Sequence, residues 1–381
     1  MPIHLVFALV LFHTSCLRAS RVLVTLYALK LGAEPLTIGI LAGTFAIFPM
    51  LISWHAGKVT DRYRPRLIML CAAITSACGL ALPFFVPNLT AVFVCAALGG
   101  LAATFYNLSL QNLVGRLSTA TNRARNYSNY TMAISVANAV GPLMAGLSID
   151  SHGHELTFLY VAAVLAVPIA LLLIMGRILP ANKIEAKSKG GFKDMLFNPK
   201  IWPVIAASSV AQSGLELFQV YMPVYGNSLG LSASAIGLII ALSAAGGFAS
   251  RIILTRLIAW GSEEKVLAYA LLIGALGFMV IPFCHSLLPL SLIALVFGCG
   301  LNCTQPIVMT LMYSRSPEGR AGEALGLRFA LDNGIRAIGP VIFGAIASSI
   351  GVSAIFWISA LLLGTGGVVA HRDAQKGGRG A

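Results

Sequence analysis

The sequence places arginine, glutamate and glutamine side chains inside long apolar stretches, where a charged side chain needs a partner or a water-filled cavity. In the first stretch Thr14, Arg18, Arg21 and Thr25 follow one another at intervals of three and four residues. In a stretch of the second half the polar residues at the same spacing include Gln212, Glu216 and Gln219. Spacings of three and four residues keep side chains on one face of a helix, so each set predicts a polar stripe. Guanidinium groups bind carboxylates and phosphates, and a glutamate can carry a proton, so the stripes point to a small ionic solute.

The second half of the chain repeats the first at an offset of 198 residues. Gly141-Pro142 returns as Gly339-Pro340 (339 − 141 = 198), and the same offset sets Arg18 opposite Glu216 (216 − 18 = 198). A two-fold repeat in an apolar chain is typical of secondary transporters built from two similar bundles. At about 1.5 Å per residue, Arg18 and Glu216 both fall near the middle of their stretches. We therefore expect an ion pair between them across the bundle axis that breaks as the halves move; the alternative is a pair that only fixes helix packing.

The composition and the apolar runs predict an all-α membrane protein. Hydrophobic residues make up 57% of the chain, charged residues 10%, and the mean hydropathy is +0.85, whereas a soluble domain is about a quarter charged. The runs are continuous rather than alternating, which favours helices over the strands of a membrane barrel. We expect 12 transmembrane helices in two six-helix bundles related by an axis along the membrane normal. They lie at about residues 4–29, 36–56, 67–86, 90–114, 128–149, 156–176, 200–228, 233–258, 265–284, 288–313, 324–348 and 353–371. The domains are then 1–176 and 200–381, the latter with a short cytoplasmic tail, joined by a basic cytoplasmic linker at 177–199.

The charge distribution and the remaining motifs limit the function. The formal net charge is +13, and basic residues gather in the even-to-odd connections and the C-terminal tail, so the positive-inside rule predicts that both termini are cytoplasmic. This pattern indicates contact with anionic membrane lipid and argues against nucleic-acid binding. The seven cysteines have no metal-ligand spacing and common enzyme signatures are absent, so we expect no metal, no cofactor and no enzymatic activity. We interpret His152 and His154, beside Asp150, as part of a solvated loop.

The segment after the second apolar run resembles the signature loop of a known family. Its residues are Gly57-Lys58-Val59-Thr60-Asp61-Arg62-Tyr63-Arg64-Pro65-Arg66. They resemble Gly-x-x-x-Asp-Arg-x-Gly-Arg-Arg/Lys of the major facilitator superfamily. Ala137-x-x-x-Gly141-Pro142 resembles the family's antiporter motif, and residues 317–326 resemble its loop into the eleventh span.

This resemblance implies the major facilitator fold, alternating-access transport and a gate at the signature loop. Asp61 and Arg62 would help to lock the two halves, with a carboxylate near the positive N-terminal end of the eleventh span, around 322–325. The gating residues that we predict are Gly57, Asp61, Arg62, Arg66, Gly141, Pro142, Gly339 and Pro340. The alternatives are a loop that only sets topology and a Gly-Pro motif that only serves packing.

The same resemblance implies that spans one, four, seven and ten line a central cavity. The fourth run carries Thr104, Asn107 and Gln111, and the tenth carries Asn302 and Gln305. The eleventh run adds Arg328, Asp332 and Arg336 at intervals of four, where the carboxylate can bridge both cations; these charges belong either to the cavity or to the gate. The predicted substrate path is Thr14, Arg18, Arg21, Asn107, Gln111, Gln212, Glu216, Gln219, Asn302, Gln305, Asp332 and Arg336.

The embedded charges predict what this path carries. Four arginines against two carboxylates sum to +2 (4 − 2), which favours a solute with an anionic group. Glu216 and Asp332 are the candidate proton carriers, because burial favours a neutral carboxyl group and a nearby arginine favours the ionised form. We interpret His13, a weaker candidate, as a packed polar residue.

The resemblance and the charges together predict a secondary transporter of a small organic solute. The antiporter-like motif favours efflux in exchange for protons. Against proton coupling, Cys95 stands where the family's fourth-span motif has an arginine. Ala259-Trp260 stands near where the second copy of the signature loop would have Asp-Arg, so we expect the lock to rest on the first copy. The alternatives are an organic-anion uniporter, exchanger or uptake symporter and, in another class, a transport-inactive sensor or receptor. We expect a monomer in a bacterial cytoplasmic (inner) membrane.

Overall fold

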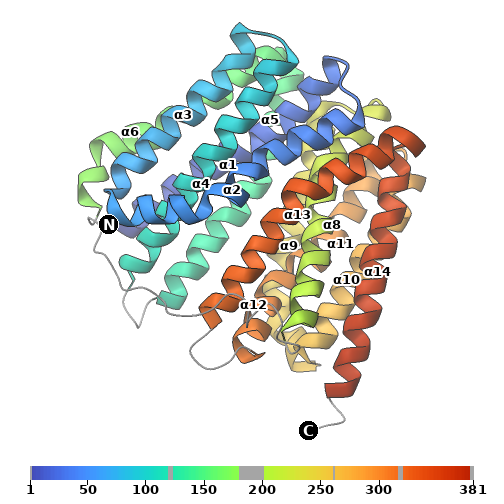
Figure 1. Ribbon diagram of the computed structural model, residues 1–381. Coiled ribbons are helices and arrows are strands. Elements are labelled where there is room, and N and C mark those ends of the chain that lie inside the picture. Colours follow the sequence, from blue (N-terminus) through green and yellow to red (C-terminus); the bar gives the residue numbers. More distant parts are fainter. Residues whose placement is uncertain (1, 119–122, 180–200, 261, 316–320, 378–381) are drawn as a thin grey trace.

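The computed structural model describes residues 2–118, 123–179, 201–260, 262–315 and 321–377, and these ranges consist of helices and short turns (Figure 1). The helices of the first half are α1 (Pro2–Lys30), α2 (Pro35–Arg62), α3 (Pro65–Phe85), α4 (Leu89–Arg116), α5 (Arg123–Val164) and α6 (Ala166–Ile174). Those of the second half are α8 (Trp202–Ser228), α9 (Ala233–Trp260), α10 (Glu263–Val280), α11 (Leu287–Asn302), α12 (Thr304–Arg315), α13 (Ala321–Ile350) and α14 (Val352–Gly377). Short 3-10 helices lie at Gly176–Ile178 and Ile281–Phe283. The predicted all-α fold is confirmed.

The helix ends follow turn and capping residues of the sequence. Pro35 and Pro65 stand at the start of α2 and α3, where the missing N–H costs no helical hydrogen bond. Asn88 caps α4, because its side chain accepts a hydrogen bond from the Ala91 amide at 2.8 Å. Gly32 and its repeat equivalent Gly230 (230 − 32 = 198) have φ angles of 83° and 72°, a region that favours glycine. They turn the chain after α1 and α8 and so set up the hairpins.

Two predicted helices are broken in the structure. The run predicted at 288–313 divides after Asn302, because Pro306 has no N–H for the Asn302 carbonyl and its ring crowds that group. The run predicted at 156–176 divides after Val164, four residues before Pro168, for the same reason. Gly153, with a φ angle of 80°, turns the chain inside α5 between the predicted fifth and sixth spans. Ten segments of the described chain are long and apolar enough to cross a membrane.

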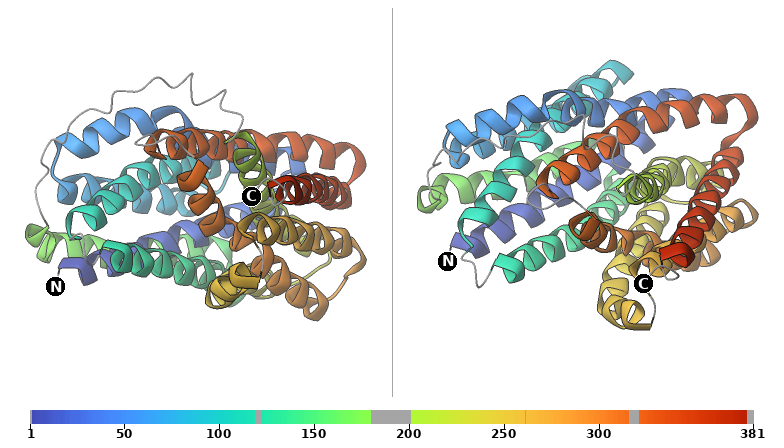
Figure 2. Two further views of the ribbon diagram at one scale, coloured as in Figure 1. Left: turned by 90° about the horizontal axis from the view of Figure 1, so that it is seen from below. Right: turned by 60° about the horizontal axis from the view of Figure 1, so that its bottom comes forward.

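The helices form two groups, one from each half of the chain (Figures 1 and 2). One buried core lies mainly between α1, α3 and α4, and another lies among the helices of the second half. A third core joins α1, α2 and α5 to residues of α8, α9 and α13. The halves meet where α2 packs along α13 and α5 packs along α9. The predicted linker at 177–199 lies, from residue 180 onward, outside the described residues.

In the described part of the chain, backbones of the two groups come into close contact at the end that contains residues 32–39, 146–153, 230–237 and 344–351, which we call the closed end. A methyl carbon added at Gly39 would stand 2.3 Å from the carbonyl oxygen of Pro340, and one added at the equivalent Gly237 would stand 2.4 Å from that of Pro142. The Tyr221 hydroxyl also donates to the Pro340 carbonyl. This close approach therefore depends on glycine at both positions.

Helix ends are also capped across the closed end. The carboxylate of Asp150 accepts hydrogen bonds from the amides of Ala233, at 3.0 Å, and Ser234, at 2.8 Å, in the first turn of α9. At the equivalent position (348 − 150 = 198), the Ser348 hydroxyl accepts from the Leu36 amide at 3.1 Å, in the first turn of α2. A helix N-terminus leaves amides unpaired and carries a positive partial charge. Each half therefore caps a helix of the other half, one with a charged group and one with a neutral group.

Candidate functional site

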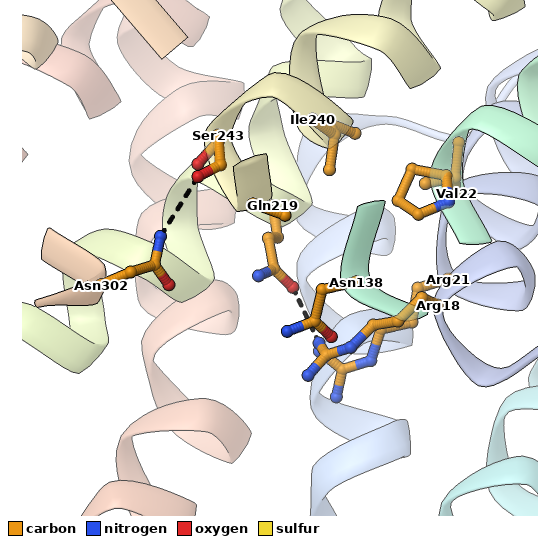
Figure 3. Close-up of a pocket in the computed structure, with 10 residues that line it drawn as sticks. Arg18, Arg21, Val22, Asn138, Gln219, Ile240, Ser243 and Asn302 are labelled. Atoms are coloured by element: carbon orange, nitrogen blue, oxygen red, sulfur yellow. Dashed lines mark hydrogen bonds between the residues drawn. The ribbon is translucent and has the colours of Figure 1, made fainter. Parts of the chain in front are cut away.

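A narrow polar pocket lies between the two groups of helices, formed by α1, α5, α8, α9 and α11 (Figure 3). Its lining consists of Arg18, Arg21, Val22, Asn138, Pro142, Gln219, Ile240, Ser243, Ala244 and Asn302. The space inside it is about 30 Å³, which corresponds to one or two water molecules. A molecule larger than this does not fit in the pocket as it stands.

Glu216 joins the two halves by ion pairs. Its Oε1 atom lies 2.8 Å from Nη1 of Arg21 on α1, and its Oε2 atom lies 3.7 Å from Nε of Arg336 on α13. The Glu216 side chain is 4% exposed, whereas those of Arg21 and Arg336 are 24% and 37% exposed. A buried carboxylate requires such pairing, because an unpaired charge in a low-dielectric interior is costly.

The predicted pair between Arg18 and Glu216 is wrong. Arg18 instead donates from Nη1 to the Gln219 amide oxygen at 3.0 Å (Figure 3). The offset of 198 relates Arg18 to Glu216 and Arg21 to Gln219 (219 − 21 = 198). The two observed contacts are therefore equivalent by the repeat. Residues at equal height do not pair, because each long guanidinium side chain reaches about one helical turn along the facing helix.

A second network lies within the second half, next to Glu216. Arg328 contacts Asp332, with Nε 3.3 Å from Oδ2, and it donates to the Ser208 hydroxyl at 2.8 Å and to the Gln305 amide oxygen. The predicted bridging of Arg328 and Arg336 by Asp332 is wrong, since Arg336 turns to Glu216. One turn of helix separates the two cations from Asp332 on either side, but the neighbouring glutamate draws Arg336 away.

Gln212 connects this network to the ion pairs of Glu216. Its side-chain oxygen accepts from Nε2 of Gln305 at 3.1 Å. With the amide turned over, the oxygen instead accepts from Nε and Nη2 of Arg336, both at 3.0 Å. In this second orientation the amide nitrogen, and not the oxygen, faces Gln305, so Gln212 lies between Arg336 and Gln305 and its oxygen can serve one of them at a time.

Two polar residues of the pocket, Asn138 and Ser243, were not predicted. Asn138 on α5 stands at the repeat equivalent of Arg336 (336 − 138 = 198), so the offset contained a signal for it. Its Oδ1 atom is buried and has no hydrogen-bond partner among the described residues. The Ser243 carbonyl on α9 accepts from the predicted residue Asn302 at 3.3 Å, and at its equivalent position (243 − 198 = 45) the first half has Phe45, which gave no polar signal.

Other predicted path residues lie outside this pocket. Thr14 is buried in α1, Asn107 is half-buried, and Gln111 is exposed on α4. His13 stacks on Tyr106, with ring centroids 3.6 Å apart and planes within 5°, inside the first half. The structure therefore gathers predicted residues of α1, α8, α11, α12 and α13 and leaves Thr14 and those of α4 apart.

The predicted gating residues fall at both ends of the molecule. Gly141, Pro142, Gly339 and Pro340 lie on the helices that meet toward the closed end. Arg66 donates from Nε and Nη2 to the carbonyls of Leu172 and Leu173, both at 2.8 Å, and so binds the end of α6 within its own half. Arg62 is exposed and lies 5.9 Å from the Tyr63 ring centroid. The surroundings of Gly57 and Asp61, and the side chains at 322–325, lie outside what the structure describes, so the lock stays a prediction.

Metal chemistry has no support in the described part of the chain, where no group of three or more histidine, cysteine, aspartate or glutamate side chains is placed to hold an ion. The described cysteines are free. The polar side chains in and beside the pocket carry guanidinium, carboxylate, amide and hydroxyl groups.

The fold and the site define a class of protein. Two repeated groups of membrane-length helices, with ionic residues where they meet, are the architecture of secondary transporters. The chain belongs to the major facilitator superfamily, because the family described as Major Facilitator Superfamily matches residues 6–337. This confirms the resemblance of the motifs and the fold, and it makes the chain a multi-pass membrane transporter.

Individual relatives share the fold at low sequence identity. The chain is 22% identical over 334 residues to Multidrug resistance protein 1 of Bacillus subtilis (strain 168), covering 86% of this chain and 85% of that protein. It is 22% identical over 332 residues to Quinolone resistance protein NorA of Staphylococcus aureus (strain Mu50), covering 84% and 83%. Among solved structures, a POT family transporter in complex with 5-aminolevulinic acid has a TM-score of 0.83 at 12% identity, covering 98% and 96% of the two chains.

Proposed function

We propose that this transporter moves a small organic solute by alternating access, and that Glu216 carries the coupling proton. The supporting observation is that buried Glu216 pairs with Arg21 of the other half and with Arg336 of its own half. When the halves move, these ion pairs change, and the proton affinity of the carboxylate changes with them. Proton coupling requires a group of this kind, because its protonation state must change with its contacts between the halves and those contacts must change with its protonation state.

Export in exchange for protons is the first candidate for direction. It is supported by the names of the two relatives, a multidrug resistance protein and a quinolone resistance protein, and by the antiporter-like motif at Gly141-Pro142. In this proposal both termini are cytoplasmic, the closed end faces outward, and the protein works as a monomer in a bacterial inner membrane. The solute would enter the pocket from the cytoplasmic side.

Uptake or exchange of an organic anion is the second candidate. The observation that favours it is the charge around the pocket. Among the described residues around the pocket, Arg18, Arg21 and Arg336 are balanced by Glu216 alone, which leaves +2 (3 − 1). Such a surplus attracts a carboxylate or phosphate and repels a cation.

Flux measurements in liposomes test both candidates. The purified protein is reconstituted, and uptake of benzoate, of a zwitterionic quinolone and of tetraphenylphosphonium is measured with inward, outward and no pH gradient. Glu216→Gln should abolish flux driven by the gradient. The matched control is Glu155→Gln, which removes an exposed glutamate paired with Lys30 at the closed end. Absence of flux for every solute under every gradient would reject transport and leave the sensor or receptor alternative.

A further inference from the structure

Arg18 carries a positive charge that no carboxylate in the described chain neutralises. Its described hydrogen bond goes to the neutral amide of Gln219, and its Nε atom is buried without a partner among the described residues. Arg21 and Arg336 share Glu216, and Arg328 has its own carboxylate in Asp332. Among the described residues Glu216 is near enough to act on Arg18 only at longer range, so the Arg18 guanidinium makes no ion pair of its own.

The groups around Arg18 are suited to an anion. Figure 3 shows the side chains of Arg18 and Arg21 side by side, next to the amides of Asn138 and Gln219. Asn138 comes from α5 and Gln219 from α8, so donors of both halves surround the same point. Two adjacent guanidinium groups repel each other, and an anion between them removes this repulsion and accepts their N–H groups.

We propose that the pocket binds a carboxylate or phosphate group of the solute between Arg18 and Arg21, and that a proton on Glu216 strengthens this binding. The inference rests on the proposed function in taking this pocket as the solute site and Glu216 as the group that takes up the proton. When Glu216 is ionised, its Oε1 atom holds Arg21 at 2.8 Å and competes with the anion. Protonation releases Arg21 and raises the local charge from +2 to +3 (3 − 1 and 3 − 0).

The charged groups that face Glu216 come from two neighbouring helices. They are Arg18 and Arg21 on α1 and Arg336 on α13. The Arg328 and Asp332 pair lies further along α13, and the amides of Gln212 and Gln305 lie between. On α5 and α9 the described pocket residues are uncharged, and His13 is stacked on Tyr106 inside the first half. Among the described carboxyl groups, Glu216 is therefore the one whose protonation would release Arg21.

The sign of the linkage determines how an anionic solute moves. A proton and an anion that favour each other's binding are carried together, so an inward proton gradient drives uptake of the anion. Exchange for protons requires the opposite, a solute that competes with the proton for Glu216, and such a solute would be cationic. For anionic solutes the site therefore favours the second candidate of the proposed function.

Binding of small anions to the full-length protein in detergent tests the inference. Thermal unfolding is followed at about pH 5.5 and 7.5 with increasing benzoate or phenyl phosphate, and benzamide serves as the neutral probe. The apparent Kd of the bound anion should be about tenfold or more lower at the acid pH, since one linked proton changes it by up to about tenfold per pH unit. Comparison of benzoate with phenyl phosphate shows which anionic group the pocket prefers. Benzamide should have no effect.

Three variants assign the binding to the proposed residues. Arg18→Ala should weaken binding at both pH values by roughly tenfold or more, and Arg18→Lys, which keeps the charge, should restore part of it. Glu216→Gln should bind tightly without dependence on pH. Lys30→Gln, which removes an equal charge from an exposed ion pair, is the control and should bind like the wild type.

The inference is overturned if neither anion binds, if the apparent Kd of the wild type does not change with pH, or if Arg18→Ala binds normally. Its failure is distinct from failure of the proposed function. Flux in liposomes without acid-enhanced anion binding would retain transport and reject the linkage. Acid-enhanced binding without flux of any solute would retain the anion site and reject transport.

Discussion

The glycine contacts at the closed end predict how the conformational equilibrium can be shifted. Gly39→Ala places a methyl carbon 2.3 Å from the Pro340 carbonyl oxygen, and Gly237→Ala places one 2.4 Å from the Pro142 carbonyl oxygen. Real contacts of this kind are essentially never shorter than 3.0 Å. The facing backbones must therefore separate by at least 0.7 Å and 0.6 Å (3.0 − 2.3 and 3.0 − 2.4). Backbone atoms cannot swing aside as the end of a flexible side chain can.

The expected cost follows from this overlap. Overpacking a tight contact by one methyl group costs about 1–3 kcal/mol. The contact exists where the closed end is formed, so each alanine should shift the ratio of conformations toward opening of that end by about 5- to 150-fold. The two contacts join different pairs of helices, α2 with α13 and α5 with α9. The effects should then add in the double variant.

Spin-label distances across the closed end measure this shift. Labels at Ser151 and Ser349, both exposed, are introduced in a background in which the seven native cysteines are replaced. Each alanine variant should move the distance distribution toward longer values, and the double variant should move it further. Gly334→Ala is the matched control on α13, because a methyl carbon there meets nothing within 4 Å. Distributions equal to wild type in both single variants would refute the dependence of closure on these glycines.

Three further predictions concern the caps and the buried charges. Asp150→Asn keeps one of two acceptor oxygens at the start of α9 and loses the charge, so it should favour opening of the closed end by about 1 kcal/mol. Ser348→Ala should shift the spin-label distances less, because it removes a neutral acceptor. Equal shifts in the two variants would contradict the difference between the caps. Arg66→Gln loses two hydrogen bonds to carbonyls of α6 and should lower the free energy of unfolding by about 2 kcal/mol, seen as a lower Tm than that of the exposed control Arg64→Gln. Asp332→Asn removes the charge of a buried carboxylate that contacts Arg328 at 3.3 Å and should destabilise the protein by about 3–5 kcal/mol. A stable variant that lost only proton coupling would make Asp332 a proton carrier instead.

The family, the helices and the placement of Arg18, Arg21 and Glu216 where the two halves meet could be predicted from local patterns and from the repeat. The direction of the side chains could not. The offset of 198 states which residues are equivalent, whereas pairing depends on how far a guanidinium group reaches along the facing helix. For this reason Arg21, and not Arg18, holds Glu216.

The helix breaks and one pocket residue could have been predicted from residues other than the apolar runs. Pro306 and Pro168 stand four residues after the breaks in the tenth and sixth runs, as the loss of an N–H requires. Asn138 could have been found by subtracting 198 from Arg336. The caps at Asp150 and Ser348 had no such signal, because their partners are amides of the opposite half that only the tertiary structure brings near.

The two halves make equivalent backbone contacts at the closed end, whereas equivalent positions at the pocket differ in charge. Gly39 with Pro340 and Gly237 with Pro142 are the same contact made twice, and both depend on the absence of a side chain. At the pocket the equivalent positions differ in charge, since Arg18 is matched by Glu216 and Asn138 by Arg336. A symmetric contact lets both halves move by the same kind of rotation, but a symmetric set of charges would give like charges facing each other. Divergence at the pocket therefore reduces the repulsion between like charges that an exact duplication would create, and it leaves Arg18 without an ion pair among the described residues.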